Sequence, residues 1–182
     1  DISVTCIAPT KTFNLAGLQT AAVYAENSIL HHRMWRQLNT DEVAEPNAFA
    51  IQATIAAFQY GEEWLDELRE YVEKNKQYVT EFLQEKIPLI HPVAGDATYL
   101  MWLDCRKITE SGRQFAKFIR KTSGLYVSGG NQYGKGGEGF LRVNVATSKL
   151  VVEDGMQRLY ESVDAWRKDR KSTRLNSSHR NI

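Results

Sequence analysis

Lys11 is the residue of this chain whose position first suggests covalent chemistry. It lies between Thr10 and Thr12, in a turn that follows a short strand-like run. A lysine amine becomes a nucleophile only when it is kept partly deprotonated beside an electrophile. Most lone lysines are instead solvated surface residues, and composition alone does not separate the two interpretations.

Arg142 is a candidate for binding an anion. It lies in FLRVNV (140–145), a predicted strand in which Leu141 and Val143 face one side and Arg142 faces the other. A guanidinium can hold a carboxylate through two parallel hydrogen bonds, which fix its orientation as well as its charge. The alternation by itself favours a second interpretation, in which Arg142 lies on the solvated face of a sheet.

A glycine-rich stretch, GGNQYGKGGEG (129–139), separates two strand-like runs. The residues from Gly129 to Lys135 fit a phosphate-binding loop, but Gly136 stands where that loop needs Ser or Thr. The segment that follows is also a strand, whereas a phosphate-binding loop opens a helix. We therefore reject nucleotide binding. The stretch is either a flexible turn with positive φ angles or a mobile loop that borders an active site.

The histidines and cysteines indicate neither a metal site nor a disulfide framework. His31 and His32 are adjacent, so on a helix their side chains point about 100° apart, and the other two histidines have no partner at ligand spacing. Cys6 and Cys105 are distant in sequence and form no Cys-x-x-Cys motif. A disulfide scaffold of the secreted kind is excluded, and a reducing, cytoplasmic location is favoured.

Charge and hydropathy exclude two classes of partner. The chain has 23 Lys and Arg residues against 22 Asp and Glu, a net charge of +1, which predicts neither a nucleic-acid nor a membrane partner. Apolar residues make up 42% of the chain, an ordinary share for a globular protein. No apolar run approaches the roughly 20 residues that span a bilayer.

The candidate residues must be positioned by an alternation of strands and helices. The segment up to residue 25 reads as strand, irregular loop and strand. Helices are predicted over 27–38, from Pro46, over 62–86, from a capping box at Ser111 and Gln114, and over 152–166. Further strands are predicted over 98–104, 125–127 and 140–145.

Both ends of the sequence are unusual. The chain begins at Asp1 with a run that looks like a strand already under way, so we expect a truncated protein. At the other end, DRKSTRLNSSH resembles the in-frame translation of a common sequencing adapter. We expect residues 169–182 to be a non-native, adapter-derived tail rather than a polar disordered tail of the natural protein.

Several segments, taken in order, resemble one enzyme family. They are APTKTFNLAGLQ (8–19), AVYAENS (22–28), GEEWLDELREYVEKN (61–75), ATYLMWLD (97–104) and QYGKGGEGFLRVNVA (132–146). The first resembles the Schiff-base lysine segment of fold-type I pyridoxal 5'-phosphate (PLP) enzymes. The set is similar to the cystathionine β-lyase or C–S lyase branch, the MalY/PatB type, of the class I/II aminotransferase superfamily.

The resemblance implies a role for each candidate residue. Lys11 would bind PLP as a Schiff base and, once the substrate amine had freed it, would remove the Cα proton as general base. Thr10 would donate its hydroxyl to the cofactor phosphate. Arg142 would bind the substrate α-carboxylate, which reverses the solvated-face interpretation. Three further residues would line the substrate site: Tyr99, Asn131 and Tyr133.

The implied activity is cleavage of the Cβ–S bond of cystathionine or a related cysteine S-conjugate, which gives a thiol, pyruvate and ammonia. A class I/II aminotransferase on the same scaffold is the second candidate. Many of those enzymes carry a Ser three residues before the lysine and an Arg eight residues after it, where this chain has Ala8 and Gln19. That difference favours the lyase. The third candidate is a non-catalytic regulatory protein that keeps the fold.

The implied fold is α/β. Residues 1–42 would end a large PLP-binding domain with a mostly parallel sheet, residues 43–86 would be connecting helices, and residues 87–166 would form a small α+β domain. The parent protein would be a homodimer that acts on a small amino-acid substrate, with NTDEVAEPNAF (39–49) approaching the partner's cofactor. Because further cofactor ligands would lie outside this chain, we expect the 182 residues alone to bind PLP poorly and to turn over no substrate.

Overall fold

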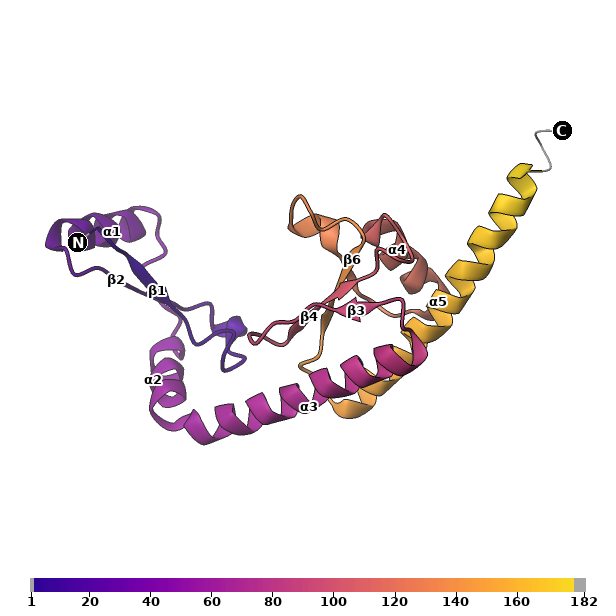
Figure 1. The fold of residues 1–182 in the computed structure, drawn as a ribbon. Coiled ribbons are helices and arrows are strands. Elements are labelled where there is room, and N and C mark those ends of the chain that lie inside the picture. Colours follow the sequence, from indigo (N-terminus) through magenta and orange to yellow (C-terminus); the bar gives the residue numbers. More distant parts are fainter. Residues whose placement is uncertain (1, 179–182) are drawn as a thin grey trace. The chain divides into compact units, whose positions relative to one another are not determined.

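The computed structural model describes residues 2–178, with side chains over residues 2–170. The chain divides into two compact units, Asp1–Arg69 and Glu70–Ile182, and the division falls within the long helix α3 (Glu62–Lys86) (Figure 1). This helix has the bounds that the sequence predicts. Among the described residues, no helix is both long enough and apolar enough to cross a membrane.

The first unit contains a two-stranded ribbon. Strands β1 (Thr5–Ile7) and β2 (Ala22–Tyr24) pair antiparallel with Cys6 opposite Val23, and the 3-10 turn η1 (Ala16–Leu18) lies in the loop between them. The prediction of a mostly parallel sheet is therefore wrong for the strands that the structure describes. A parallel pair requires a crossover connection, usually a helix, and this loop carries only a turn and one short 3-10 segment.

Two helices follow the ribbon, α1 (Ser28–Thr40) and α2 (Ala50–Tyr60). The first agrees with the helix predicted over 27–38. The second begins at Ala50 rather than at Pro46, which corrects the sequence prediction. The side chain of Asn47 accepts a hydrogen bond from the backbone N–H of Phe49, and this local turn competes with the helix.

The first unit buries few of its apolar side chains. Among its described residues, Pro9, Ala25 and Ala50 are the buried ones. Large apolar side chains are exposed on both strands and on both helices; they include Ile7, Tyr24, Trp35, Ile55 and Phe58. A two-stranded ribbon is marginally stable by itself, and unit 1 has little buried apolar core to support it.

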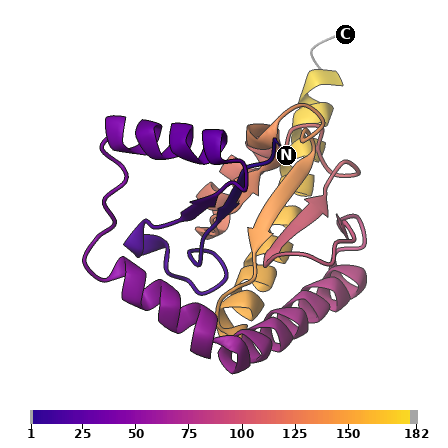
Figure 2. The same ribbon diagram turned by 90° about the vertical axis from the view of Figure 1, so that its left-hand side faces the viewer.

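The second unit carries a four-stranded antiparallel sheet in the order β3-β4-β6-β5. Its strands are β3 (His91–Pro92), β4 (Leu100–Asp104), β5 (Ser128–Gly129) and β6 (Phe140–Asn144). The two longest, β4 and β6, lie side by side and pair along their whole length (Figure 2). Strand β3 was not predicted. The strand predicted over 125–127 lies instead at 128–129, because those are the residues that pair with β6.

Alternate residues of β4 and β6 divide the sheet into a buried and a more open face. Met101 and Leu103 on β4 and Leu141 on β6 are buried, whereas Trp102 and Arg142 lie on the other face. The buried face meets apolar side chains from α3, α4 (Gly112–Ser123) and α5 (Lys149–Ser178); they are Val79, Leu83, Phe115, Ile119, Met156 and Leu159. The small α+β unit therefore has a core of its own.

The two helices of this unit differ in how well the sequence predicted their ends. Helix α4 begins as expected, because the Ser111 hydroxyl accepts a hydrogen bond from the backbone N–H of Gln114, and it ends at Gly124 with φ 75°. Helix α5 continues past the predicted end at 166 to Ser178. Of the expected non-native tail, residues 169–178 continue this helix and 179–182 lie outside the described residues.

A buried amide ties α3 to the end of β6. Asn75 is 2% exposed, and its Nδ2 donates hydrogen bonds to the backbone oxygens of Val145 at 2.9 Å and Thr147 at 3.0 Å. These bonds satisfy carbonyl groups where the strand has ended and the chain turns toward α5. They hold the end of the Arg142 strand against the helix.

Replacing Asn75 with Ala removes both hydrogen bonds and leaves two carbonyl oxygens without this donor. We expect unit 2 to lose about 2–4 kcal/mol of unfolding free energy, measured by hydrogen exchange of the β6 amides in increasing urea. Lys74→Ala is the matched control, because the neighbouring Lys74 is exposed and its ion pair with Glu70 spans 3.9 Å. Equal losses in the two variants would contradict the assignment.

Candidate active site

The turn that carries Lys11 is closed by two backbone hydrogen bonds. The N–H of Phe13 donates to the Pro9 carbonyl at 2.9 Å, and the N–H of Leu15 donates to the Thr10 carbonyl at 3.0 Å. Pro9 is buried, Thr10 is half-buried and Lys11 is exposed. The lysine side chain therefore extends from a hydrogen-bonded piece of backbone and is open to solvent.

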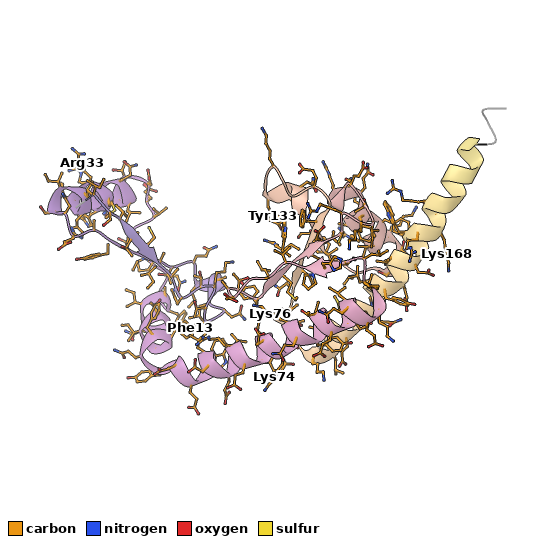
Figure 3. All side chains as sticks on the ribbon, in the orientation of Figure 1. Phe13, Arg33, Lys74, Lys76, Tyr133 and Lys168 are labelled. Atoms are coloured by element: carbon orange, nitrogen blue, oxygen red, sulfur yellow. The ribbon has the colours of Figure 1, made fainter. Side chains whose placement is uncertain are left out.

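Phe13 anchors this turn at the corner between α2 and α3 (Figure 3). Its ring meets Phe58 edge-on at 5.7 Å and stacks with Trp64 at 6.1 Å, both measured between ring centroids. Gly61 lies at the same corner, and a Cβ there would fall 2.5 Å from the Phe13 ring. The close approach thus requires glycine, which the sequence signalled only as a break between two helices.

Arg142 lies on the open face of the unit 2 sheet, directly opposite Trp102 on β4. Its guanidinium carbon lies 4.2 Å from the centroid of the Tyr133 ring. No residue in the described part of the chain forms a hydrogen bond or ion pair with this guanidinium. A guanidinium that lies over an aromatic ring, without a carboxylate partner, has N–H groups available for an anion.

Three aromatic rings extend from Arg142 across the same face. The Trp102 ring meets Tyr133 edge-on at 5.8 Å and stacks on Phe140 at 5.6 Å. Arg106 lies at the far end, with its guanidinium carbon 4.9 Å from the centroid of Phe140. We call these five residues the aromatic array. Sequence reasoning did not place Trp102 and Phe140 at the site. Alternation along β6 puts Phe140 on the face of Arg142, and the pairing of β4 with β6 puts Trp102 there.

The base of the glycine-rich stretch is closely packed. The stretch forms a 3-10 helix, η2 (Gly130–Tyr133), and the backbones of the buried Gly130 and Gly137 are in contact. A Cβ on Gly130 would collide with the Gly137 carbonyl oxygen and would lie 2.9 Å from both the Trp102 ring and the Phe140 Cβ. The positive φ angles predicted for this stretch are confirmed at Gly134 (115°), Gly136 (92°) and Gly139 (75°), whereas Gly130 and Gly137 are required by close packing.

Asn131 and Tyr99 complete the unit 2 residues expected at the site. Asn131 lies in η2, and its Oδ1 is buried without a hydrogen-bond partner among the described residues. Tyr99 lies just before β4 and is half-buried, and its carbonyl accepts a hydrogen bond from the Val145 N–H at 3.0 Å. The structure therefore brings Tyr133 and Arg142 into contact, and it places Asn131 on the same short segment as Tyr133.

The other two expected residues, Thr10 and Lys11, lie together in unit 1. The structure thus groups the six candidates into two sets, each within its own unit. Within residues 2–178, no three His, Cys, Asp or Glu side chains are grouped in a way that could hold a metal ion.

The charges beside the aromatic array are paired with one another. Arg106 donates to the Asp104 carboxylate from its guanidinium at 3.0 and 2.7 Å and from its backbone N–H at 3.0 Å. The side-chain hydrogen bond is the largest cause that lowers the pKa of Asp104 from 3.8 to about 2. Within the described residues of the array, Arg142 is therefore the guanidinium without a carboxylate partner.

Cys105, which follows β4, is unsuited to nucleophilic chemistry. The residue is fully buried, and desolvation raises the pKa of its thiol to about 12. At neutral pH the thiol stays protonated and has no access to solvent. Cys105 therefore offers no nucleophile to this unit.

Comparison with known proteins decides the family. Residues 3–159 match the family model described as aminotransferase class I and II. The chain belongs to this family. Cystathionine beta-lyase PatB of Bacillus subtilis is 38% identical over 159 residues, which are 87% of this chain and 41% of that protein.

Two solved structures that contain PLP agree with this assignment. The PLP-bound C–S lyase of Staphylococcus hominis, complexed with L-cycloserine, has a TM-score of 0.77 and 31% identity over 88% of this chain and 39% of that chain. Cystalysin of Treponema denticola, whose structure contains PLP, has a TM-score of 0.84 and 25% identity over 89% of this chain and 41% of that chain. The resemblance to the C–S lyase branch is confirmed.

This chain spans about 40% of the length of the relatives that it matches. It matches them with an α/β arrangement in which the described strands pair antiparallel. Its relatives of moderate identity are C–S lyases and cystathionine β-lyases.

The packing of Gly130 predicts that even a methyl group there disturbs the array. Gly130→Ala should displace Trp102 and lower the unfolding free energy of unit 2 by about 1–3 kcal/mol. Near-ultraviolet circular dichroism should report the displacement as a weaker tryptophan signal. Gly95→Ala is the control, since a Cβ at Gly95 has no atom within 4 Å. An unchanged spectrum for Gly130→Ala would show that the loop base is not tightly packed.

The pairing of Asp104 predicts a pH dependence with a definite sign. The folded-state pKa is about 2 and the ordinary value is 3.8, so the pair stabilises the fold above about pH 4 and this contribution is lost as the pH falls toward 2. Arg106→Ala should return the pKa of Asp104 toward 3.8, measured by carbon NMR titration of its carboxyl group. The exposed Lys117→Ala on α4 should leave it near 2, and a shift of equal size there would refute the pairing as the cause.

Proposed function

We propose that this chain is the C-terminal part of a PLP-dependent C–S β-lyase. The enzyme would cleave cystathionine or a related cysteine S-conjugate to a thiol, pyruvate and ammonia. The observation that carries the proposal is the 38% identity to a cystathionine β-lyase. Two features of the chain support it: Lys11 lies exposed on a hydrogen-bonded turn, and Arg142 has no carboxylate partner among the described residues.

Two residues of unit 1 fit the binding of PLP, the Lys11 amine and the Thr10 hydroxyl beside it. Lys11 is exposed, and no described residue forms a hydrogen bond or ion pair with its amine, so the amine is available to the cofactor aldehyde. The Thr10 hydroxyl is adjacent and can donate to a phosphate oxygen. Ala8 and Gln19 bring no charge to the turn. We infer that the charged phosphate ligands come from polypeptide outside this chain.

The chain's own residues would divide the chemistry between binding and proton transfer. PLP, when bound, supplies an electron sink for the charge that develops at the substrate Cα. The Lys11 amine would accept the Cα proton as general base. Arg142 would hold the α-carboxylate through parallel N–H donors and so fix the orientation of the substrate. Tyr133 would keep water from one face of that guanidinium.

A class I/II aminotransferase is the second candidate, because the matching family model carries that description. Both activities would use Lys11 and Arg142 in the same way. They differ in the fate of the substrate, since only a lyase releases pyruvate from cystathionine without a keto-acid acceptor. The identity to a cystathionine β-lyase favours the lyase.

We further propose that the complete protein is a cytoplasmic homodimer. The exposed apolar residues of α2, among them Ile51, Ile55 and Phe58, support a surface that is covered in the complete protein. The segment 39–49 leads directly into this helix and would contribute to the same boundary, near the partner's cofactor. Sedimentation of the complete protein measures its oligomeric state.

The central test is made on the complete protein. Borohydride reduction of the PLP-loaded protein, followed by peptide mapping, should place the trapped adduct on the peptide that contains Lys11. Lys11→Ala should remove the cofactor absorbance and lower pyruvate release by at least about 100-fold. The exposed Lys121→Ala on α4 is the matched control and should keep both. An adduct on a different lysine would refute the proposal.

A further inference from the structure

Arg142 is held in place by an aromatic ring. Its guanidinium carbon lies 4.2 Å from the centroid of Tyr133, and the Tyr133 ring is met edge-on by Trp102 at 5.8 Å. Arg106, at the other end of the array, is held by the Asp104 carboxylate instead. Arg142 is thus held by a cation–π contact, and Arg106 by an ion pair.

We propose that Tyr133 and Trp102 are positioning residues that hold the Arg142 guanidinium in the orientation that binds the substrate α-carboxylate. The inference rests on the proposed function, because it requires a carboxylate at Arg142. It assigns these two side chains no contact with the reacting atoms.

The kind of partner decides what Arg142 can still bind. A carboxylate partner takes up the N–H donors of a guanidinium, as Asp104 does with two of those of Arg106. An aromatic ring attracts the cation through its face and takes up none of the in-plane donors. A ring partner therefore holds the Arg142 guanidinium over the Tyr133 ring without a carboxylate, and its donors stay available for a substrate.

Trp102 supplies the support that Tyr133 needs. Tyr133 lies in η2, outside the strands, so its own backbone does not belong to the sheet. Trp102 lies on β4 directly across from Arg142 and stacks on Phe140 at 5.6 Å. Gly130 lets the loop backbone approach the Trp102 ring closely. The tryptophan thus links the sheet to the ring that carries the guanidinium.

A purely structural role makes a different prediction from a positioning role. If the array only stabilises the unit, loss of a ring affects folding and the turnover of every substrate alike. If it positions Arg142, the loss raises KM for substrates that carry an α-carboxylate and leaves kcat nearly unchanged. A phenylalanine at 133 keeps the ring and should restore binding, because the hydroxyl is not the group that contacts Arg142.

The experiment compares variants of the complete PLP-loaded enzyme in steady-state pyruvate release. Tyr133→Leu and Trp102→Leu should raise KM about 5- to 20-fold with kcat changed less than about 2-fold. Tyr133→Phe is the rescue variant: it keeps the ring, so its KM should lie within about 2-fold of the wild-type value. Tyr126→Leu is the matched control, because Tyr126 is an exposed tyrosine whose ring lies 5.1 Å from a different guanidinium, that of Arg120. If Trp102→Leu fails to fold, Trp102→Phe replaces it in the comparison. A wild-type KM for Trp102→Phe supports the inference, because a supporting ring is kept. A lower kcat for Trp102→Phe overturns it.

A double variant shows whether the effect passes through Arg142. Tyr133→Leu should raise KM no further in an Arg142→Ala background, since the group that it positions is gone. Additive effects would overturn the inference, and so would an equal rise in KM for Tyr133→Phe. If Arg142→Ala raises KM and Tyr133→Leu does not, only the positioning role is wrong. If Arg142→Ala leaves KM unchanged, the proposed carboxylate site is wrong, and the positioning role is wrong with it.

Discussion

The antiparallel register between β4 and β6 is the constraint on which the position of Arg142, and with it the proposed carboxylate site, depends. It places Leu103 opposite Leu141 in the core and Trp102 opposite Arg142 on the open face. A slip of one residue would exchange the two faces, burying an unpaired guanidinium and exposing Leu141 to water. The position of Arg142 is therefore enforced by apolar packing on the opposite side of the sheet.

The elements that the sequence predicts well are those whose pattern repeats along the element. Helix α3 is found at its predicted bounds, and β4 and β6 lie within their predicted ranges, because many residues of each contribute to one periodicity. The short strand β3 was not predicted, β5 lies at 128–129 rather than at 125–127, and β1 pairs with β2 antiparallel where a mostly parallel sheet was expected. Two or three residues carry no measurable period, and the direction of pairing depends on a connection that the local sequence does not determine.

The candidate site was predictable to a different degree at each residue. Spacing alone favoured a solvated face for Arg142, and only the family resemblance pointed to a carboxylate. Alternation along the strand put Phe140 on the face of Arg142, but nothing in the sequence gave it a role there. Trp102 lies on a different strand, and its place on this face follows only from the register that pairs it with Arg142. For Gly130, sequence offered turn geometry as the reason for glycine, whereas the structure shows close packing against Trp102. A glycine in a sequence does not show whether turn geometry or close packing requires it.

The two halves of the chemistry rest on units of different physical character. Unit 2 has its own apolar core, so the register that places Arg142 and the packing of its aromatic array are determined within it. Unit 1 fixes the backbone of the Lys11 turn through Phe13, yet it leaves Lys11 and much apolar surface exposed. A lysine becomes an effective base only in a partly desolvated environment. If Lys11 is the base that we propose, that environment would have to form when further polypeptide covers unit 1. Substrate orientation would then be a local property of this chain, and lysine reactivity a property of the complete protein.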